Sequence, residues 1–255
     1  MELHGKVVVV TGGGNGIGAS LARRFAAEGA AAVVVADLDG RAARAVASEI
    51  GGSGRTLDVT DEQAVSELVA DVLREQGRID LYCSNAGIAL GRGPETPDAD
   101  WQRIWEVNAM SHVRMARHVV PAMLAAGRGH VLGTVSAAGL LNAMTSAPYG
   151  VTKAAALSFF EWLAITHGDR IGVSCLCPQG VRTRMLEFDE GMARLLWESA
   201  RTPEEVAESV VAGLREERFL ILPHPEVSTY FERKALDYDR WLRGMRRLRA
   251  SLPGS

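Results

Sequence analysis

Short apolar runs rich in valine alternate along the chain with stretches of helical period, and this alternation constrains the fold more than any other feature. Strands buried on both faces and joined by crossover helices have this pattern. The expected strands lie near 6–10, 31–37, 54–58, 79–84, 129–135, 171–177 and 218–222, and the expected helices near 16–28, 40–50, 61–76, 98–127, 147–167 and 203–215. Short crossovers favour parallel strands. The sequence therefore predicts an α/β fold, a doubly wound sheet of seven parallel strands with helices on both faces.

The chain length favours one domain. At 255 residues the chain fits a single large α/β domain, and no repeat or low-complexity linker divides it. We therefore expect residues 1–255 to form one domain. Two segments, 86–97 and 178–202, fit neither period, and both follow the carboxyl end of an expected strand, where ligands of open α/β sheets bind. We expect a variable lid near 182–202 and a C-terminal helical tail near 226–249.

Composition argues against several classes of protein. The 28 basic and 31 acidic residues give a net charge of -3, which leaves no basic field to attract nucleic acid. No run of about 18 apolar residues predicts a membrane span, and the chain does not start with a signal-peptide core. Three cysteines without a Cys-x-x-Cys pair indicate a reducing compartment, so we expect a cytoplasmic protein. None of the six histidines lies in a metal-ligand pattern, so we expect no metal.

A glycine-rich turn, TGGGNGIG at residues 11–18, follows the first expected strand and leads into a helix. Glycine permits positive φ and leaves no Cβ between the backbone and a ligand, and the amides of a helix N-terminus attract a pyrophosphate. The second strand ends at Asp37, 21 residues beyond Gly16, where a carboxylate can accept hydrogen bonds from an adenosine ribose. This spacing predicts a dinucleotide site. The alternatives are a tight turn without a ligand and, for Asp37, a helix cap.

Asp37 also bears on the choice of cofactor. Its carboxylate repels the 2′-phosphate of NADP, and neither Leu38 nor Asp39 supplies an arginine that would bind it. Arg41 and Arg44 on the following helix remain able to reach a phosphate. We therefore expect NAD, with NADP as the alternative.

Tyr149 and Lys153 are four residues apart at the start of an expected helix, so their side chains share one face. A phenol ionises near pH ~10, and a neighbouring ammonium favours the phenolate, which brings its pKa closer to the range useful for proton transfer. Ser136, at the end of the preceding strand, can hydrogen-bond the same substrate oxygen. Because such a pair is also common on surface helices, its interpretation as an acid–base pair depends on the glycine turn.

Together these motifs resemble the short-chain dehydrogenase/reductase family over nearly the whole chain. The resemblance rests on the glycine turn, on Asn85-Ala86-Gly87, on Ser136 and on Tyr149-x-x-x-Lys153. It implies a Rossmann-type, dinucleotide-binding catalytic domain that transfers hydride between a nicotinamide and a carbonyl or secondary alcohol. It implies that Tyr149 is the catalytic acid/base, and that Lys153 lowers the pKa of Tyr149 and binds the nicotinamide ribose. Ser136 would position the substrate oxygen, and Asn108 would support a water relay to Lys153.

The resemblance also implies a set of cofactor-binding residues: Gly12, Asn15, Gly16, Ile17, Gly18, Asp37, Asp58, Val59, Asn85, Gly87, Tyr149, Lys153, Val181 and Thr183. Asp58 and Val59 match the family's adenine contact, whereas Val181 and Thr183 match the residues that hold the nicotinamide carboxamide. The sequence departs from the family at two places. Pro178-Gln179-Gly180 stands where many members have Pro-Gly, which allows a different backbone path beside the nicotinamide. Ser84-Asn85 stands where many have two asparagines, which removes one amide.

The sequence thus predicts an NAD-dependent oxidoreductase that interconverts a secondary alcohol and a ketone on a mainly hydrophobic small molecule. The alternatives are an NADPH-dependent carbonyl reductase and a non-catalytic dinucleotide-binding protein. A hydrophobic substrate is expected because apolar side chains flank the inferred nicotinamide site: Leu140, Leu141, Met144, Met185, Leu186, Phe188, Met192, Leu195, Leu196 and Trp197. Arg182, Arg184 and Arg194 are the exceptions, since each could bind an anion.

The expected helix 147–167 is apolar around most of its circumference, which predicts a homo-oligomer, either a dimer or a tetramer.

Overall fold

A computed structural model of the chain describes residues 1–187 and 196–252. Within these residues a sheet of seven strands has the order β3-β2-β1-β4-β5-β6-β7, and every neighbouring pair is parallel. The strands are β1 (Val7–Thr11), β2 (Ala32–Asp37), β3 (Ser53–Thr56), β4 (Leu81–Ser84), β5 (His130–Thr134), β6 (Gly172–Leu176) and β7 (Leu220–Ile221). The seven-stranded parallel sheet expected from the valine-rich runs is confirmed.

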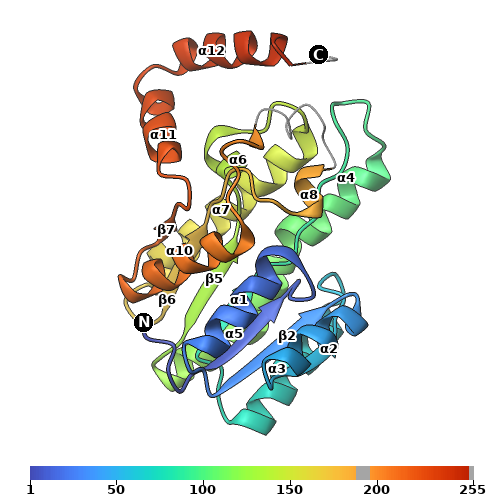
Figure 1. Cartoon of the computed structure of the whole chain (residues 1–255), viewed down its shortest axis with the longest axis vertical. Helices are drawn as coiled ribbons and strands as arrows, with labels where there is room; N and C mark the ends of the chain where they lie inside the picture. Colours follow the sequence, from blue (N-terminus) through green and yellow to red (C-terminus); the bar gives the residue numbers. More distant parts are fainter. Residues whose placement is uncertain (188–195, 253–255) are drawn as a thin grey trace.

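Helices cover both faces of the sheet (Figure 1). One buried apolar cluster joins one face to α1 (Gly16–Ala27), α2 (Gly40–Glu49) and α10 (Pro203–Arg215). A second cluster joins the other face to α3 (Glu62–Gln76), α5 (Ser111–Ala126) and α7 (Ala147–His167). The fold is therefore the doubly wound, Rossmann-type arrangement. The chain reverses its direction of winding between β1 and β4, and a cleft opens at the carboxyl ends of strands at such a point.

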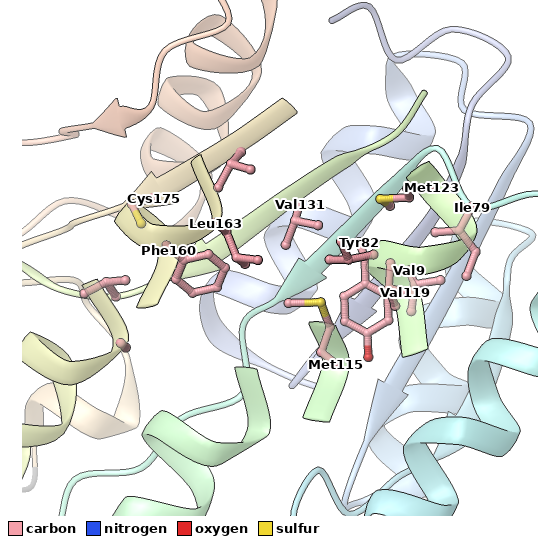
Figure 2. Close-up of a cluster of buried hydrophobic side chains, with 14 of the residues drawn as sticks. Val9, Ile79, Tyr82, Met115, Val119, Met123, Val131, Phe160, Leu163 and Cys175 are labelled. Carbon is pink, nitrogen blue, oxygen red and sulfur yellow. The ribbon is translucent and has the colours of Figure 1, made fainter. Parts of the chain in front are cut away.

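The core fixes how closely α7 approaches the sheet. Figure 2 shows Phe160 of α7 in the buried cluster with Tyr82, Met115 and Val131. Gly133 of β5 makes room for this ring, because a Cβ at Gly133 would come within 2.1 Å of Phe160. The absence of a side chain at this position therefore lets α7 pack tightly on β5 and brings the first turns of α7 beside the end of that strand.

The expected helix over 98–127 forms without a break from Asp98 to Ala126, but it contains a π turn that the sequence did not predict. The structure has α4 (Asp98–Trp105), a π-helical turn η1 (Glu106–Met110) and then α5. Asn108 lies in the π turn and hydrogen-bonds the backbone of Ile88, so a contact with another part of the chain accompanies the change in winding. π turns of this kind often mark functional sites.

Helix caps decide where two other helices begin. Asp61 caps α3 by accepting hydrogen bonds from the amides of Gln63 and Ala64. Thr202 and Glu205 form a reciprocal capping box at α10, with proline in the first turn.

Within its described residues the structure has two short helices that the sequence did not predict. These are α6 (Ala137–Leu141) and α8 (Arg184–Glu187). Of the expected lid near 182–202, residues 188–195, with Phe188, Met192, Arg194 and Leu195, lie outside the described residues. The expected tail near 226–249 consists of α11 (Glu226–Leu236) and α12 (Tyr238–Ala250), separated at Asp237. Both helices project from the sheet and its covering helices (Figure 1).

Candidate active site

The glycine turn forms a close-fitting cradle between β1 and α1. Gly12 has a φ of 62°, and a Cβ on it would come within 2.8 Å of the Cα of Ala86. A Cβ on Gly18 would lie 2.1 Å from the carbonyl oxygen of Gly12. Asn15 precedes α1 without capping it through its side chain, so the first amides of α1 remain donors for a ligand. The glycines thus let the turn pack closely on itself and on Ala86, with the first amides of α1 beside the cleft, and the residues present fit a dinucleotide.

Asp37 ends β2 beside this cradle. One carboxylate oxygen accepts a hydrogen bond from the Gly14 amide at 2.9 Å, and the other accepts one from the Asp39 amide at 3.0 Å. Asp39, not Asp37, caps α2, so the helix-cap alternative for Asp37 does not hold. Asp58 and Val59 line the same end of the cleft. The carboxylate of Asp37 therefore remains at the cleft wall with acceptor capacity to spare.

A hydrogen-bonded chain connects the glycine turn to Lys153. The amide group of Asn85 donates to the carbonyls of Thr11 and Gly12 at 3.0 and 3.2 Å. Its oxygen accepts from the hydroxyl of Thr134 at 2.9 Å, and the carbonyl of Thr134 accepts from Lys153 Nζ at 3.0 Å. Both N–H donors of the Asn85 side chain are thus used within the protein. Asn85 braces β1 against β5, and its side chain has no donor left for a cofactor.

Three predicted catalytic residues meet at the carboxyl end of β5. Ser136 precedes α6, and its hydroxyl accepts a hydrogen bond from the Ala138 amide at 3.0 Å. Tyr149 lies in the first turn of α7 and is hydrogen-bonded to Ser136. Lys153 follows one turn later, with Nζ 5.8 Å from the centroid of the Tyr149 ring. All three line one cleft of about 1860 Å³ together with Gly12, Asn15, Gly16, Ile17 and Gly18.

Burial governs the ionisation of this group. It raises the pKa of the Tyr149 phenol above its ordinary value, and the hydrogen bond with Ser136 opposes that shift. Burial also lowers the pKa of Lys153 to about 8. The expected lowering of the Tyr149 pKa is therefore wrong for the protein alone, because burial of the phenol outweighs the effects that favour its ionised form.

Asn108 approaches the lysine from the π turn. Its side-chain oxygen accepts from the Ile88 amide at 2.9 Å, and its amide donates to the Ile88 carbonyl at 2.8 Å. A Cβ at Gly87 would lie 3.3 Å from Lys153 Nζ and 3.5 Å from Asn108 Oδ1, so these three residues are neighbours. The water relay expected for Asn108 stays a prediction.

The segment expected to hold the nicotinamide returns to the glycine turn. Val181 is buried, and Thr183 lines the cleft, where a Cβ on Gly16 would lie 3.2 Å from Thr183 Cγ2. Gln179, at the family's glycine position, does not have a positive φ, so a side chain is tolerated there. The dinucleotide cradle and the nicotinamide segment thus face each other.

Sequence reasoning missed three polar residues that support the site. Thr134 connects Asn85 to Lys153, and its position two residues before Ser136 was the available signal. His112 Nδ1 and the hydroxyl of Ser84 share a hydrogen bond of 2.7 Å. Ser84 is the residue that replaces the first of the family's two asparagines, and His112 follows Asn108 by one helical turn. His224 contacts Gln179, and no motif marks it.

The described residues also bear on membrane and metal sites. Among the described residues no helix is long and apolar enough to cross a membrane. The same part of the chain contains no group of three or more histidine, cysteine, aspartate or glutamate side chains arranged to hold a metal ion.

The fold and the cleft place the protein among Rossmann-type oxidoreductases. The model of the short chain dehydrogenase family matches residues 6–192. The chain belongs to this family, the short-chain dehydrogenases/reductases, and the resemblance inferred from its motifs is confirmed.

Named relatives and a solved structure are similar over most of their length. Meso-2,3-butanediol dehydrogenase of Serratia marcescens is 36% identical over 219 residues, which are 81% of this chain and 86% of the relative. 1-Deoxy-11-beta-hydroxypentalenate dehydrogenase of Streptomyces exfoliatus is 34% identical over 236 residues, covering 89% and 86%. A short-chain dehydrogenase/reductase from Burkholderia phymatum, solved in complex with NAD, has a TM-score of 0.84 at 27% identity and covers 94% of this chain and 96% of its own.

Proposed function

We propose that the protein is an NAD-dependent oxidoreductase that interconverts a secondary alcohol and a ketone on a mainly hydrophobic small molecule. The observation that carries this proposal is the meeting of Ser136, Tyr149 and Lys153 in one cleft with the glycine cradle. Relatives named as dehydrogenases of a butanediol and a hydroxypentalenate support the reaction type. A binding protein without turnover would have no chemical need for this set of side chains.

The chain's own residues provide the proton transfer. A bound nicotinamide supplies the acceptor or the donor of the hydride. Tyr149 accepts the hydroxyl proton when an alcohol is oxidised and returns it when a ketone is reduced. Ser136 Oγ accepts from the Ala138 amide at 3.0 Å, and its own proton makes only a long, 3.5 Å hydrogen bond to the Pro178 carbonyl, which a substrate oxygen can replace. Lys153, fixed by the carbonyl of Thr134, favours the phenolate through its charge.

Three features favour NAD over NADP. Asp37 places a negative charge where a 2′-phosphate would lie, and Leu38 beside it is exposed and apolar. The charges of Arg41 and Arg44 act on Asp39, and neither arginine lines the cleft. The Burkholderia phymatum neighbour was solved with NAD. The second candidate is a carbonyl reductase that uses NADPH. It requires Arg41 or Arg44 to turn toward the adenosine ribose and bind its 2′-phosphate.

The cleft wall supports a mainly hydrophobic substrate. Leu141, Met144, Met185, Leu186 and Leu196 line it on the catalytic side, as does Trp241 of α12. Of the arginines weighed against this, Arg182 faces the ring of Trp197 at 6.0 Å and does not line the cleft, whereas Arg184 does. Further arginines also line the cleft: Arg92, Arg103, Arg233, Arg240 and Arg247. It is therefore the apolar part of the wall that would exclude water from the path of the hydride.

We further propose a homo-oligomer formed through α7. Phe160 and Leu163 bury one side of this helix against the sheet. On the opposite side Val151, Trp162 and Ile165 are 49%, 54% and 85% exposed, and their spacing puts them on one face. A second copy would cover this apolar face.

The three cysteines, all buried and free, fit the cytoplasmic location that we propose.

A turnover screen tests the proposal. Purified protein is incubated with NAD or NADP and pairs of secondary alcohols that differ only in a carboxylate, and absorbance of the reduced nicotinamide is recorded. We expect higher kcat/KM with NAD and with the uncharged partner of each pair. If the carboxylate partners are consistently better and Arg184→Ala removes their advantage, the substrate class is wrong. If no alcohol or ketone turns over while the dinucleotide binds, the non-catalytic alternative replaces the proposal.

A further inference from the structure

His224 lies between β7 and α11, outside the motifs described above, and contacts the segment expected to hold the nicotinamide. Its side chain is almost fully buried, with 1% of the residue surface exposed. Nδ1 accepts a hydrogen bond from the backbone amide of Gln179 at 3.1 Å. Nε2 is also buried and has no hydrogen-bond partner of normal geometry among the described residues. A buried imidazole is thus fixed against the residue at which the sequence departs from Pro-Gly.

The segment 178–183, which we call the nicotinamide segment, is otherwise attached at its two ends. The Pro178 carbonyl accepts from the Ala137 amide at 2.8 Å, next to Ser136. Farther along, the Gly180 carbonyl accepts from the Arg201 amide at 3.0 Å, and the Arg182 amide donates to the Arg201 carbonyl at 2.9 Å. The Gln179 amide lies between these attachments. His224 therefore holds the one stretch of backbone that joins the catalytic serine to Val181 and Thr183.

The surroundings of His224 keep its acceptor nitrogen available. Because Nδ1 accepts from an amide, the neutral ring carries its proton on Nε2. Burial lowers the pKa of His224, and the positive charge of Arg201 acts in the same direction. Glu226, at the start of α11, and the carbonyls of Gly180 and Ser199 act in the opposite direction and raise the pKa. The net lowering favours the neutral ring, which can accept the Gln179 hydrogen bond.

We propose that His224 is a positioning residue for the nicotinamide end of the cofactor, acting through the backbone of Gln179. The inference rests on the proposed function, in that a nicotinamide must occupy the cleft beside Val181 and Thr183. His224 is buried and does not line the cleft, so it acts through the backbone and not by contact with a ligand. Its hydrogen bond fixes the course of the backbone from Pro178 to Thr183, and Thr183 in turn faces the glycine cradle at Gly16. Loss of the bond would leave the Gln179 amide without its partner and let this backbone shift.

Two ligands separate positioning from general damage. NADH carries the nicotinamide, whereas ADP-ribose shares its adenosine and pyrophosphate but lacks that ring. Dissociation constants for both are measured by calorimetry on wild type, His224→Leu and His224→Asn, with a thermal melt of each. His224→Leu removes the acceptor, whereas the Oδ1 of Asn replaces Nδ1 at the same number of bonds from the backbone. His130→Gln is the matched control, because His130 is also a buried histidine but lies at the start of β5, whereas Ser136 and the cleft lie at the other end of that strand.

The expected result is specific to one ligand. His224→Leu should weaken NADH binding about fivefold to tenfold, the effect of one net hydrogen bond, and leave ADP-ribose binding unchanged. His224→Asn should restore most of the NADH affinity, and His130→Gln should change neither ligand. Equal loss for both ligands, or no loss for NADH, overturns the inference. If His224→Leu does not fold, the result for His224→Asn decides. This variant retains the acceptor, so an NADH affinity more than about tenfold below that of wild type overturns the inference. Wild type that binds ADP-ribose and shows no added affinity for NADH contradicts the proposed function instead.

Discussion

His130 occupies a place where the folded protein has no room for a second ring proton. It begins β5, and its Nε2 lies 2.8 Å from the hydroxyl of Ser174. That hydroxyl donates its own proton to the Arg218 carbonyl at 2.6 Å. Nε2 of His130 therefore donates to the Ser174 oxygen, and Nδ1 carries the lone pair of the neutral ring. A Cβ at Gly172 would come within 2.1 Å of Nδ1, which shows how closely the backbone packs there. Burial accordingly lowers the pKa of His130 to about 4.

This shift predicts how stability depends on pH. The unfolded chain should titrate at the ordinary pKa of about 6.5. Between pH 6.5 and 4 the unfolded chain binds a proton that the folded protein excludes, so the free energy of unfolding falls as pH falls through this window. The contribution is complete above the unfolded pKa and stops changing below the folded one. From the two pKa values the loss at about pH 5, relative to about pH 7.5, is about 2 kcal/mol.

Urea unfolding at these two pH values tests the reasoning. The Nε2 of Gln in His130→Gln can replace the donor to Ser174 but does not titrate. The free energy of unfolding of wild type should fall by about 2 kcal/mol more than that of His130→Gln, and sedimentation checks that the assembly is the same at both pH values. His4→Gln, at an exposed histidine, is the control and should behave like wild type. The same pH dependence in wild type and His130→Gln would refute the argument.

Three further predictions concern the site and the assembly. Tyr149→Phe should reduce turnover at least about 100-fold and leave NADH affinity near that of wild type, whereas Lys153→Ala should impair both. If Tyr149→Phe retains more than about a tenth of the wild-type rate, the acid/base role of Tyr149 is contradicted. Asp37→Ala should move the ratio of kcat/KM for NAD and NADP toward unity, and a wild-type preference for NADP would reject the cofactor assignment. A Trp162→Glu, Ile165→Glu double variant should sediment as a monomer, and a monomeric wild type at micromolar concentration would rule out the α7 interface.

The sequence predicted the sheet well because its strands carry a strong local signal. β1 is four valines and a threonine, all buried, so burial on both faces is visible in the residue types themselves. The π turn at Glu106–Met110 had no such signal. Its winding accompanies the contact of Asn108 with Ile88, 20 residues away, and periodicity within one helix does not report a contact of that kind. Helices as short as α6 and α8 are also shorter than the window in which a period can be recognised.

At the site, sequence motifs located residues better than they assigned roles. Tyr149, Ser136 and Lys153 line one cleft as expected. Asn85 lines the same cleft, but the motif did not indicate that its side chain connects Gly12 to Thr134. The role depends on which partners the fold brings within hydrogen-bond distance, and those partners lie about 50 to 70 residues away in the chain.

The brace through Asn85 has a consequence for how the two halves of the site work together. A side-chain amide with both donors and one acceptor engaged has little freedom to move. Because its partners are the carbonyl of Gly12 at one end and the hydroxyl of Thr134 at the other, the phosphate cradle and the end of β5 are held at a fixed separation. The Thr134 carbonyl then fixes Lys153 Nζ. The position of the ammonium is therefore set by the same contacts that shape the cradle, and a dinucleotide bound at the glycine turn would meet an already oriented lysine.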